Sequence, residues 1–124
     1  MCIRDSFTST DAGTLTNAGR PLVVNQFGCW NNYFVEPRYN TLGHVLLVSG
    51  DRGAAATLGM ATLSDIETEG FLGPILTRKL MERGKSIGQA LVEAKAEVAL
   101  LAPNRPDVQA GMTLLGDPEL VLNP

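Results

Sequence analysis

The sequence predicts an α/β domain in which helices cover both faces of a mostly parallel sheet. Short β-favouring apolar segments alternate with segments of helical periodicity along the 124 residues, and this alternation is typical of βαβ units. Hydrophobic residues make up 44% of the chain and charged residues 19%, which is enough apolar material for a packed core. The predicted strands are few for this architecture, so we expect upstream strands of a larger domain to be missing.

Three short segments predict strands. Residues 21–27 (PLVVNQF) and 53–60 (GAAATLGM) carry apolar or small side chains at consecutive positions, as strands covered on both faces do. The third is 119–122 (ELVL), which follows a turn at 113–118. The polar, irregular segment 28–38 comes directly after the first strand, so we expect a loop at that strand's carboxyl end.

Helices are predicted where apolar residues recur at helical spacing. These segments are 42–49, 67–83 and 87–101. Thr41 can cap the first of them, and Ser86 with Gln89 forms a capping box at the start of the last. Residues 7–20 are rich in loop-forming residue types and predict a loop or a short capped turn.

Charge and residue spacing exclude several classes of function. Ten basic and thirteen acidic residues give a net charge of −3, so the basic surface of a nucleic-acid binder is missing. No apolar run approaches the roughly 18 residues of a membrane span. Acidic residues and glycines lack the spacing of a calcium loop or a phosphate-binding loop, so we expect no metal and no cofactor. Residues 1–6 (MCIRDS) resemble translated sequencing adapter, and we expect them to be non-native.

Cys29 is the candidate reactive group, because it follows a predicted strand at the end where ligands gather in open parallel sheets. Gly28 permits a tight turn before it. A thiol there could attack a carbonyl carbon once a base deprotonates it, and its own main-chain amide could bind the oxyanion. The alternative is a buried structural cysteine. Trp30, Tyr33 and Phe34 either wall a substrate pocket or anchor the loop to the core.

Five segments occur in a recognisable order: LTNAGRP at 15–21, LVVNQFGC at 22–29, GAAA at 53–56, SIGQAL at 86–91 and LLGDPEL at 114–120. Together they resemble the carboxyl-terminal half of the catalytic domain of gingipain-type cysteine peptidases, family C25 of the caspase-like clan. The resemblance implies a partial caspase-like three-layer sandwich, with residues 7–124 forming the carboxyl-terminal half of the domain. It also implies a secreted or cell-surface bacterial enzyme that hydrolyses peptide bonds through a Cys–His pair.

Cys29 matches the family's nucleophile, and its amide matches one oxyanion donor. The family's histidine belongs to a His-Gly element upstream of the nucleophile, which this sequence lacks. His44 comes after Cys29 on a predicted helix, so we expect the base on the missing upstream part and an inactive fragment. The expected partner is a protein or peptide substrate. The candidate substrate-pocket residues are Gly28, Trp30, Gly59 and Met60. The alternative function is a non-catalytic structural or interaction module of a large surface protein.

Overall fold

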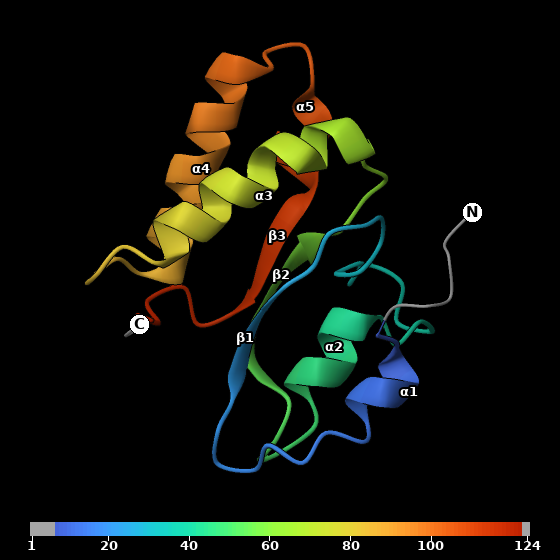
Figure 1. Ribbon diagram of the computed structural model, residues 1–124. Helices are drawn as coiled ribbons and strands as arrows, with labels where there is room; N and C mark the ends of the chain where they lie inside the picture. The colour runs from blue at the N-terminus through green and yellow to red at the C-terminus, as the bar shows by residue number, and fades with distance from the viewer. Residues whose placement is uncertain (1–6, 123–124) are drawn as a thin grey trace.

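The computed structural model describes residues 7–122 and shows a three-stranded sheet between two layers of helices (Figure 1). The predicted non-native start, residues 1–6, lies outside the described residues. In chain order the elements are α1 (Ser9–Ala12), β1 (Leu22–Asn25), α2 (Leu42–Leu47), β2 (Ala54–Met60), α3 (Ile66–Leu80), α4 (Ile87–Leu101), α5 (Pro106–Gly111) and β3 (Met112–Gly116). The predicted α/β class and layered arrangement are confirmed.

The sheet has the order β1-β2-β3, with β2 in the centre. β1 pairs with β2 in parallel, as predicted, and β3 pairs with β2 antiparallel. The antiparallel pair arises because three helices, α3, α4 and α5, connect β2 to β3 in place of a single crossover helix. α3 leads away from the end of β2 and α4 returns beside it (Figure 1), so β3 starts where β2 ended and runs back along it.

The last strand was predicted at the wrong place. The segment 113–118 was expected to be a turn, whereas most of it belongs to β3. Residues 119–122 form only an isolated bridge between Val121 and Ser86. The physical reason is α5, a short helix that the sequence analysis missed. It begins at Pro106 and places Met112 against Met60 at the end of β2.

Most of the apolar core lies between the sheet and the layer of α3, α4 and α5. Side chains alternate across β2, and Ala56, Leu58 and Met60 on this face are fully buried. Leu72 and Leu76 of α3 are also fully buried there. Complete burial of a leucine side chain contributes about 1.5–3 kcal/mol, so this face supplies most of the stabilisation. A smaller cluster joins Ala12, Leu46 and Ala54 on the opposite face, under α1 and α2.

Side chains cap α1, α3 and α4, whereas Thr41, the predicted cap of α2, makes no side-chain hydrogen bond to that helix. α3 begins after Asp65, whose carboxylate accepts a hydrogen bond from the Glu67 N–H at 2.9 Å, and it runs through Pro74. α4 has the predicted bounds, and the Ser86 hydroxyl accepts from the Gln89 N–H at 3.3 Å. Residues 7–20 contain the short helix α1, capped by Thr8. The helices cover the two faces of the sheet, and the loop after β1 lies over one end of it.

Candidate active site

The loop that follows β1 is irregular, as predicted, and it is fastened to the end of β2. The main-chain N–H groups of Trp30 and Asn32 donate to the carbonyls of Thr62 and Met60, at 3.2 and 2.9 Å. Gly28 has φ of +128°, and Trp30 adopts the left-handed region at +65°. Such values are easy for glycine and uncommon for other residues. The two flanking conformations turn the chain sharply at Cys29.

A buried asparagine, Asn32, anchors this loop, and the sequence analysis did not single it out. Its side chain is fully buried, and Nδ2 donates to the carbonyls of Thr57 and Thr113, at 3.2 and 3.3 Å. Oδ1 accepts from the Thr57 hydroxyl at 3.3 Å. Gly43 and Gly59 lie so close to the Asn32 carboxamide that a Cβ on either would press on it. One amide therefore ties the loop to both β2 and β3.

Cys29 lies beyond the carboxyl ends of β1 and β2 and is half-buried. Three atoms of Ser64, in the segment after β2, surround its sulfur. The Ser64 N–H donates to Sγ at 3.4 Å. The Ser64 carbonyl oxygen lies 3.5 Å from Sγ and its Oγ lies 3.6 Å away. The thiol is thus at the predicted end of the sheet, and its immediate polar neighbour is a residue that sequence reasoning missed.

Ser64 is connected in turn to Glu69, in the first turn of α3. The Ser64 hydroxyl is hydrogen-bonded to the Glu69 carboxylate through Oε1. Glu69 is only 6% exposed, and within residues 7–122 it forms no ion pair. A helix amino terminus favours a negative charge, which accounts for a carboxylate at this place. Its burial is the signal that could have identified it, and burial is not visible in a sequence.

The main-chain amide of Cys29 donates no hydrogen bond within residues 7–122. An amide that is not occupied by a protein acceptor can bind a developing oxyanion. The only histidine of the sequence, His44, lies on α2 with an exposed side chain. Among the described residues, the hydrogen bonds of the Cys29 thiol all go to Ser64.

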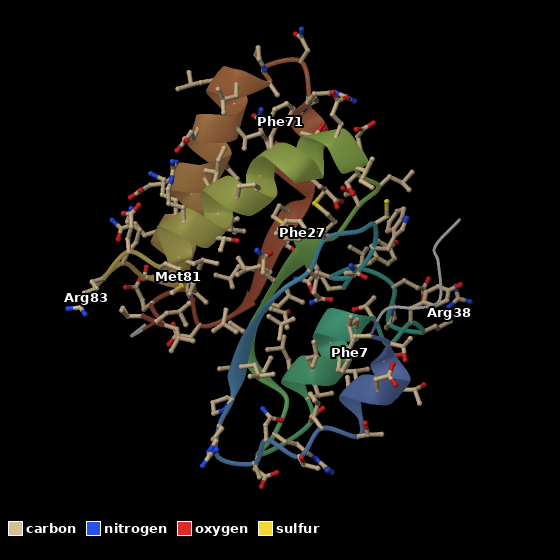
Figure 2. The ribbon with its side chains drawn as sticks, in the orientation of Figure 1. Phe7, Phe27, Arg38, Phe71, Met81 and Arg83 are labelled. Atoms are coloured by element: carbon tan, nitrogen blue, oxygen red, sulfur yellow. The ribbon has the colours of Figure 1, made fainter. Side chains whose placement is uncertain are left out.

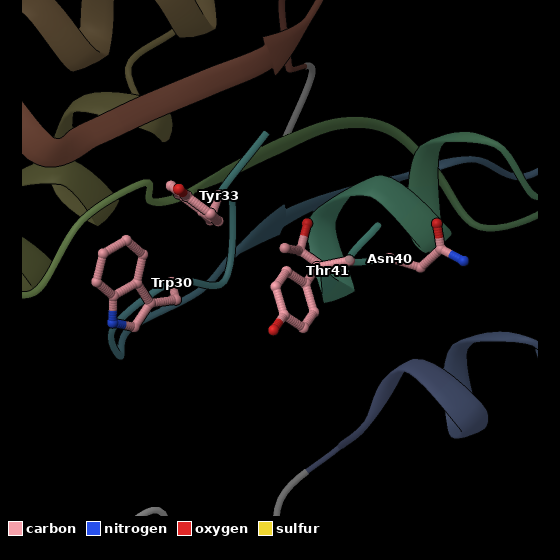
Figure 3. A pocket seen from close by; sticks show the side chains of 5 residues that line it. Trp30, Tyr33, Asn40 and Thr41 are labelled. Carbon is pink, nitrogen blue, oxygen red and sulfur yellow. The ribbon is translucent and has the colours of Figure 1, made fainter. Parts of the chain in front are cut away.

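An open aromatic pocket of about 440 Å³ lies beside this loop (Figure 3). It is lined by Trp30, Tyr33, Tyr39, Asn40 and Thr41. Trp30 and Tyr33 meet edge to face, with ring centroids 4.7 Å apart. The Thr41 hydroxyl is buried without a hydrogen-bond partner in the described structure. Trp30 and Tyr33 therefore wall a pocket, whereas Phe34 is 60% exposed and does not line it.

The other predicted pocket residues are placed differently. Gly59 packs against the Asn32 carboxamide, and Met60 is fully buried in the main core. Neither lines a described pocket. Gly28 forms the turn before the thiol. A second open groove runs along α3 and is bordered by Glu69 and by Phe27, which lies toward α3 against Gly73 (Figure 2).

Two further observations on the described residues concern a metal site and a membrane span. In the part of the chain that the structure describes, no three histidine, cysteine, aspartate or glutamate side chains gather where they could ligate a metal ion. No described helix combines the length and apolar character that a membrane span requires.

Comparison with known proteins gives one family. The model of peptidase family C25 matches residues 3–123, nearly the whole chain. Neither the curated proteins nor the solved structures with which the sequence was compared include a significant match.

Proposed function

The chain belongs to peptidase family C25, and on that premise we propose that the intact protein is a cysteine endopeptidase whose nucleophile is Cys29. The family implies a cysteine peptidase that acts on proteins. The position of Cys29 supports the more specific assignment. The thiol follows β1 at the carboxyl end of the parallel strand pair, on a turn shaped by Gly28 and Trp30, and it is half-buried. Residues that act on ligands gather at this end of such sheets.

In the proposed reaction the Cys29 thiolate attacks the carbonyl carbon of the scissile peptide bond. The C=O electron pair moves onto oxygen, where the unoccupied Cys29 N–H donates to it. Collapse of this intermediate breaks the C–N bond, and the amine leaves with the proton that the general base took from the thiol. Water then attacks the thioester, releases the carboxylic acid and restores the thiol.

The proposed general base is a histidine that precedes this sequence in the same catalytic domain. His44 does not fit the role, because it is exposed on α2 and makes no hydrogen bond to Cys29. We accordingly propose that residues 7–124 are the carboxyl-terminal half of the domain and are inactive alone. An extracellular or cell-surface location is part of the same proposal and rests on the resemblance to gingipain-type enzymes.

The aromatic pocket is the proposed contact for a substrate side chain. Trp30 lines this pocket and directly follows the nucleophile in the chain, which supports the assignment. Tyr33 and Tyr39 add further apolar walls. Pockets of this size with aromatic walls are typical binding sites for organic groups.

The second candidate function is a non-catalytic caspase-like module that serves structure or interaction. One observation favours it: every hydrogen bond of the Cys29 thiol within residues 7–122 goes to Ser64, and no base faces the sulfur there. The residue that decides between the two functions is the one at the His-Gly position upstream. Histidine supports the enzyme, and its replacement supports the module.

The test is active-site labelling of the longer reading frame that contains this sequence. The expressed protein is treated with a peptide carrying a thiol-directed electrophile, and the labelled peptide is identified by mass spectrometry. We expect label on Cys29, and loss of both label and peptidase activity in Cys29→Ala. Labelling that is absent, or that persists in Cys29→Ala, contradicts the assignment of the nucleophile.

A further inference from the structure

The contacts of the Cys29 sulfur point to a residue that controls the reactivity of this thiol, an inference that rests on the proposed function of Cys29. Ser64 meets Sγ with its N–H at 3.4 Å, its carbonyl oxygen at 3.5 Å and its hydroxyl oxygen at 3.6 Å. The Ser64 hydroxyl donates its hydrogen to Oε1 of Glu69. The side of Oγ that faces the sulfur is then a lone pair.

This geometry matches a thiol better than a thiolate. The S–H of Cys29 has two acceptors within reach, the carbonyl oxygen and Oγ of Ser64. A thiolate would face the same two oxygens without a hydrogen between them, and only the Ser64 N–H would donate to it. The Ser64 hydroxyl could become a second donor to the thiolate by rotating, but rotation breaks its bond to the Glu69 carboxylate.

We propose that Ser64 is a positioning residue that holds Cys29 as a thiol in the resting protein, and that Glu69 fixes the direction of the Ser64 hydroxyl. Glu69 is suited to this because it is 6% exposed and carries no cation partner among residues 7–122. Its hydrogen bond to Ser64 is therefore not shared with an ion pair. Release of the hydroxyl from Glu69 allows Ser64 to turn its hydrogen to the sulfur and stabilise the nucleophile.

The inference is tested on the 124-residue chain itself, without peptidase activity. Iodoacetamide is added, and the alkylation rate of Cys29 is followed by peptide mass spectrometry, with Cys2 as a reference thiol in the same molecule. Glu69→Gln keeps an acceptor oxygen but removes the charge that strengthens its hold on the Ser64 hydroxyl, so we expect the rate of Cys29 near neutral pH to rise by about three- to tenfold. Glu67→Gln is the matched control, because Glu67 lies in the same helical turn with its side chain 71% exposed, and it should change the rate by less than about twofold.

Double substitution shows whether the effect passes through Ser64. In a Ser64→Ala background the further change Glu69→Gln should alter the alkylation rate of Cys29 by less than about twofold. Without the Ser64 hydroxyl, Glu69 has no group through which to act on the sulfur, so the two substitutions are not additive. Ser64→Thr keeps the hydroxyl and should restore the wild-type rate. The rates of wild type and Glu69→Gln should also converge at about pH 10.5, where ordinary thiols are ionised in both proteins.

The outcomes separate this inference from loosening of the fold and from the proposed function. An unchanged rate in Glu69→Gln, or an equal effect of that change with and without Ser64, overturns the inference. A rate increase that persists at high pH also overturns it, because loosening exposes the sulfur at every pH. None of these results bears on whether the longer protein cleaves peptides, which the labelling of Cys29 with a peptide electrophile decides separately.

Discussion

Replacing Asn32 by aspartate tests how the active-site loop is held. The substitution keeps the shape of the side chain and therefore leaves no cavity. It replaces the Nδ2 donor, which lies 3.2 Å from the Thr57 carbonyl and 3.3 Å from the Thr113 carbonyl, by an oxygen. Near neutral pH an ionised oxygen would face two carbonyl oxygens at a fully buried position.

The loss can be estimated from these contacts. Two hydrogen bonds contribute about 1 kcal/mol each, and an unpaired buried charge brings the total to about 3–5 kcal/mol. Burial and the two carbonyl oxygens that face the new oxygen raise the pKa of the carboxyl group above its unfolded value of about 3.9, although Thr57 and Gln26 still donate to its other oxygen. The destabilisation therefore grows as the pH rises through that value. At about pH 3 the group is protonated in both states, its O–H can donate to one carbonyl, and the loss falls to about 1 kcal/mol.

The assay is urea unfolding of the variant and wild type at both pH values. Circular dichroism reports the helices, and the fluorescence of Trp30, the only tryptophan, reports the loop. Asn31→Asp is the matched control, because the Asn31 side chain makes one hydrogen bond, to the Phe27 carbonyl at 3.4 Å, and should cost less than about 1 kcal/mol. The reasoning is refuted if Asn32→Asp costs less than about 1 kcal/mol near neutral pH, or if its cost is the same at both pH values.

Three further changes test other contacts. Gly43→Ala should lower the free energy of unfolding in urea by about 1–3 kcal/mol, because its Cβ would overlap the buried carboxamide of Asn32. Gly70→Ala is the control: it has open space around it in α3 and should be neutral or stabilise by up to about 1 kcal/mol. Burial lowers the pKa of Lys95, so its charged amine opposes folding. Lys95→Met should therefore raise the melting temperature near neutral pH, and the gain should shrink as the pH rises toward about 10.4, the pKa of lysine in the unfolded chain. The hydrogen bond from the Glu67 N–H, with help from Arg105, lowers the pKa of Asp65. The stabilisation from the Asp65 carboxylate is therefore present above its unfolded pKa and is lost as pH falls through its folded pKa. Asp65→Asn should lower the melting temperature near neutral pH and match wild type in strong acid, and a pH-independent difference would contradict this.

Local chemistry determined the parts of the fold that the sequence predicted well. The helix at 87–101 was predicted with its observed bounds, because Ser86 supplies a cap and the apolar stripe faces one way. The strand at 53–60 was recognised because every position of β2 is small or apolar. The position of Cys29 after a strand was also readable from order along the chain. Several short segments of the sequence resemble family C25, and the model of that family matches residues 3–123.

Only the tertiary structure decided the direction of β3 and the neighbours of the thiol. β3 runs antiparallel because α3 and α4 form a pair that returns the chain to the end of β2, and no residue within 112–116 encodes that direction. Asn32, Ser64 and Glu69 are polar residues of ordinary appearance in the sequence. The roles of Asn32 and Ser64 come from contacts between segments 25 or more residues apart, and the role of Glu69 comes from its burial beside Ser64. Local propensity cannot report such contacts, because they form only when the loop after β1 closes over the end of β2.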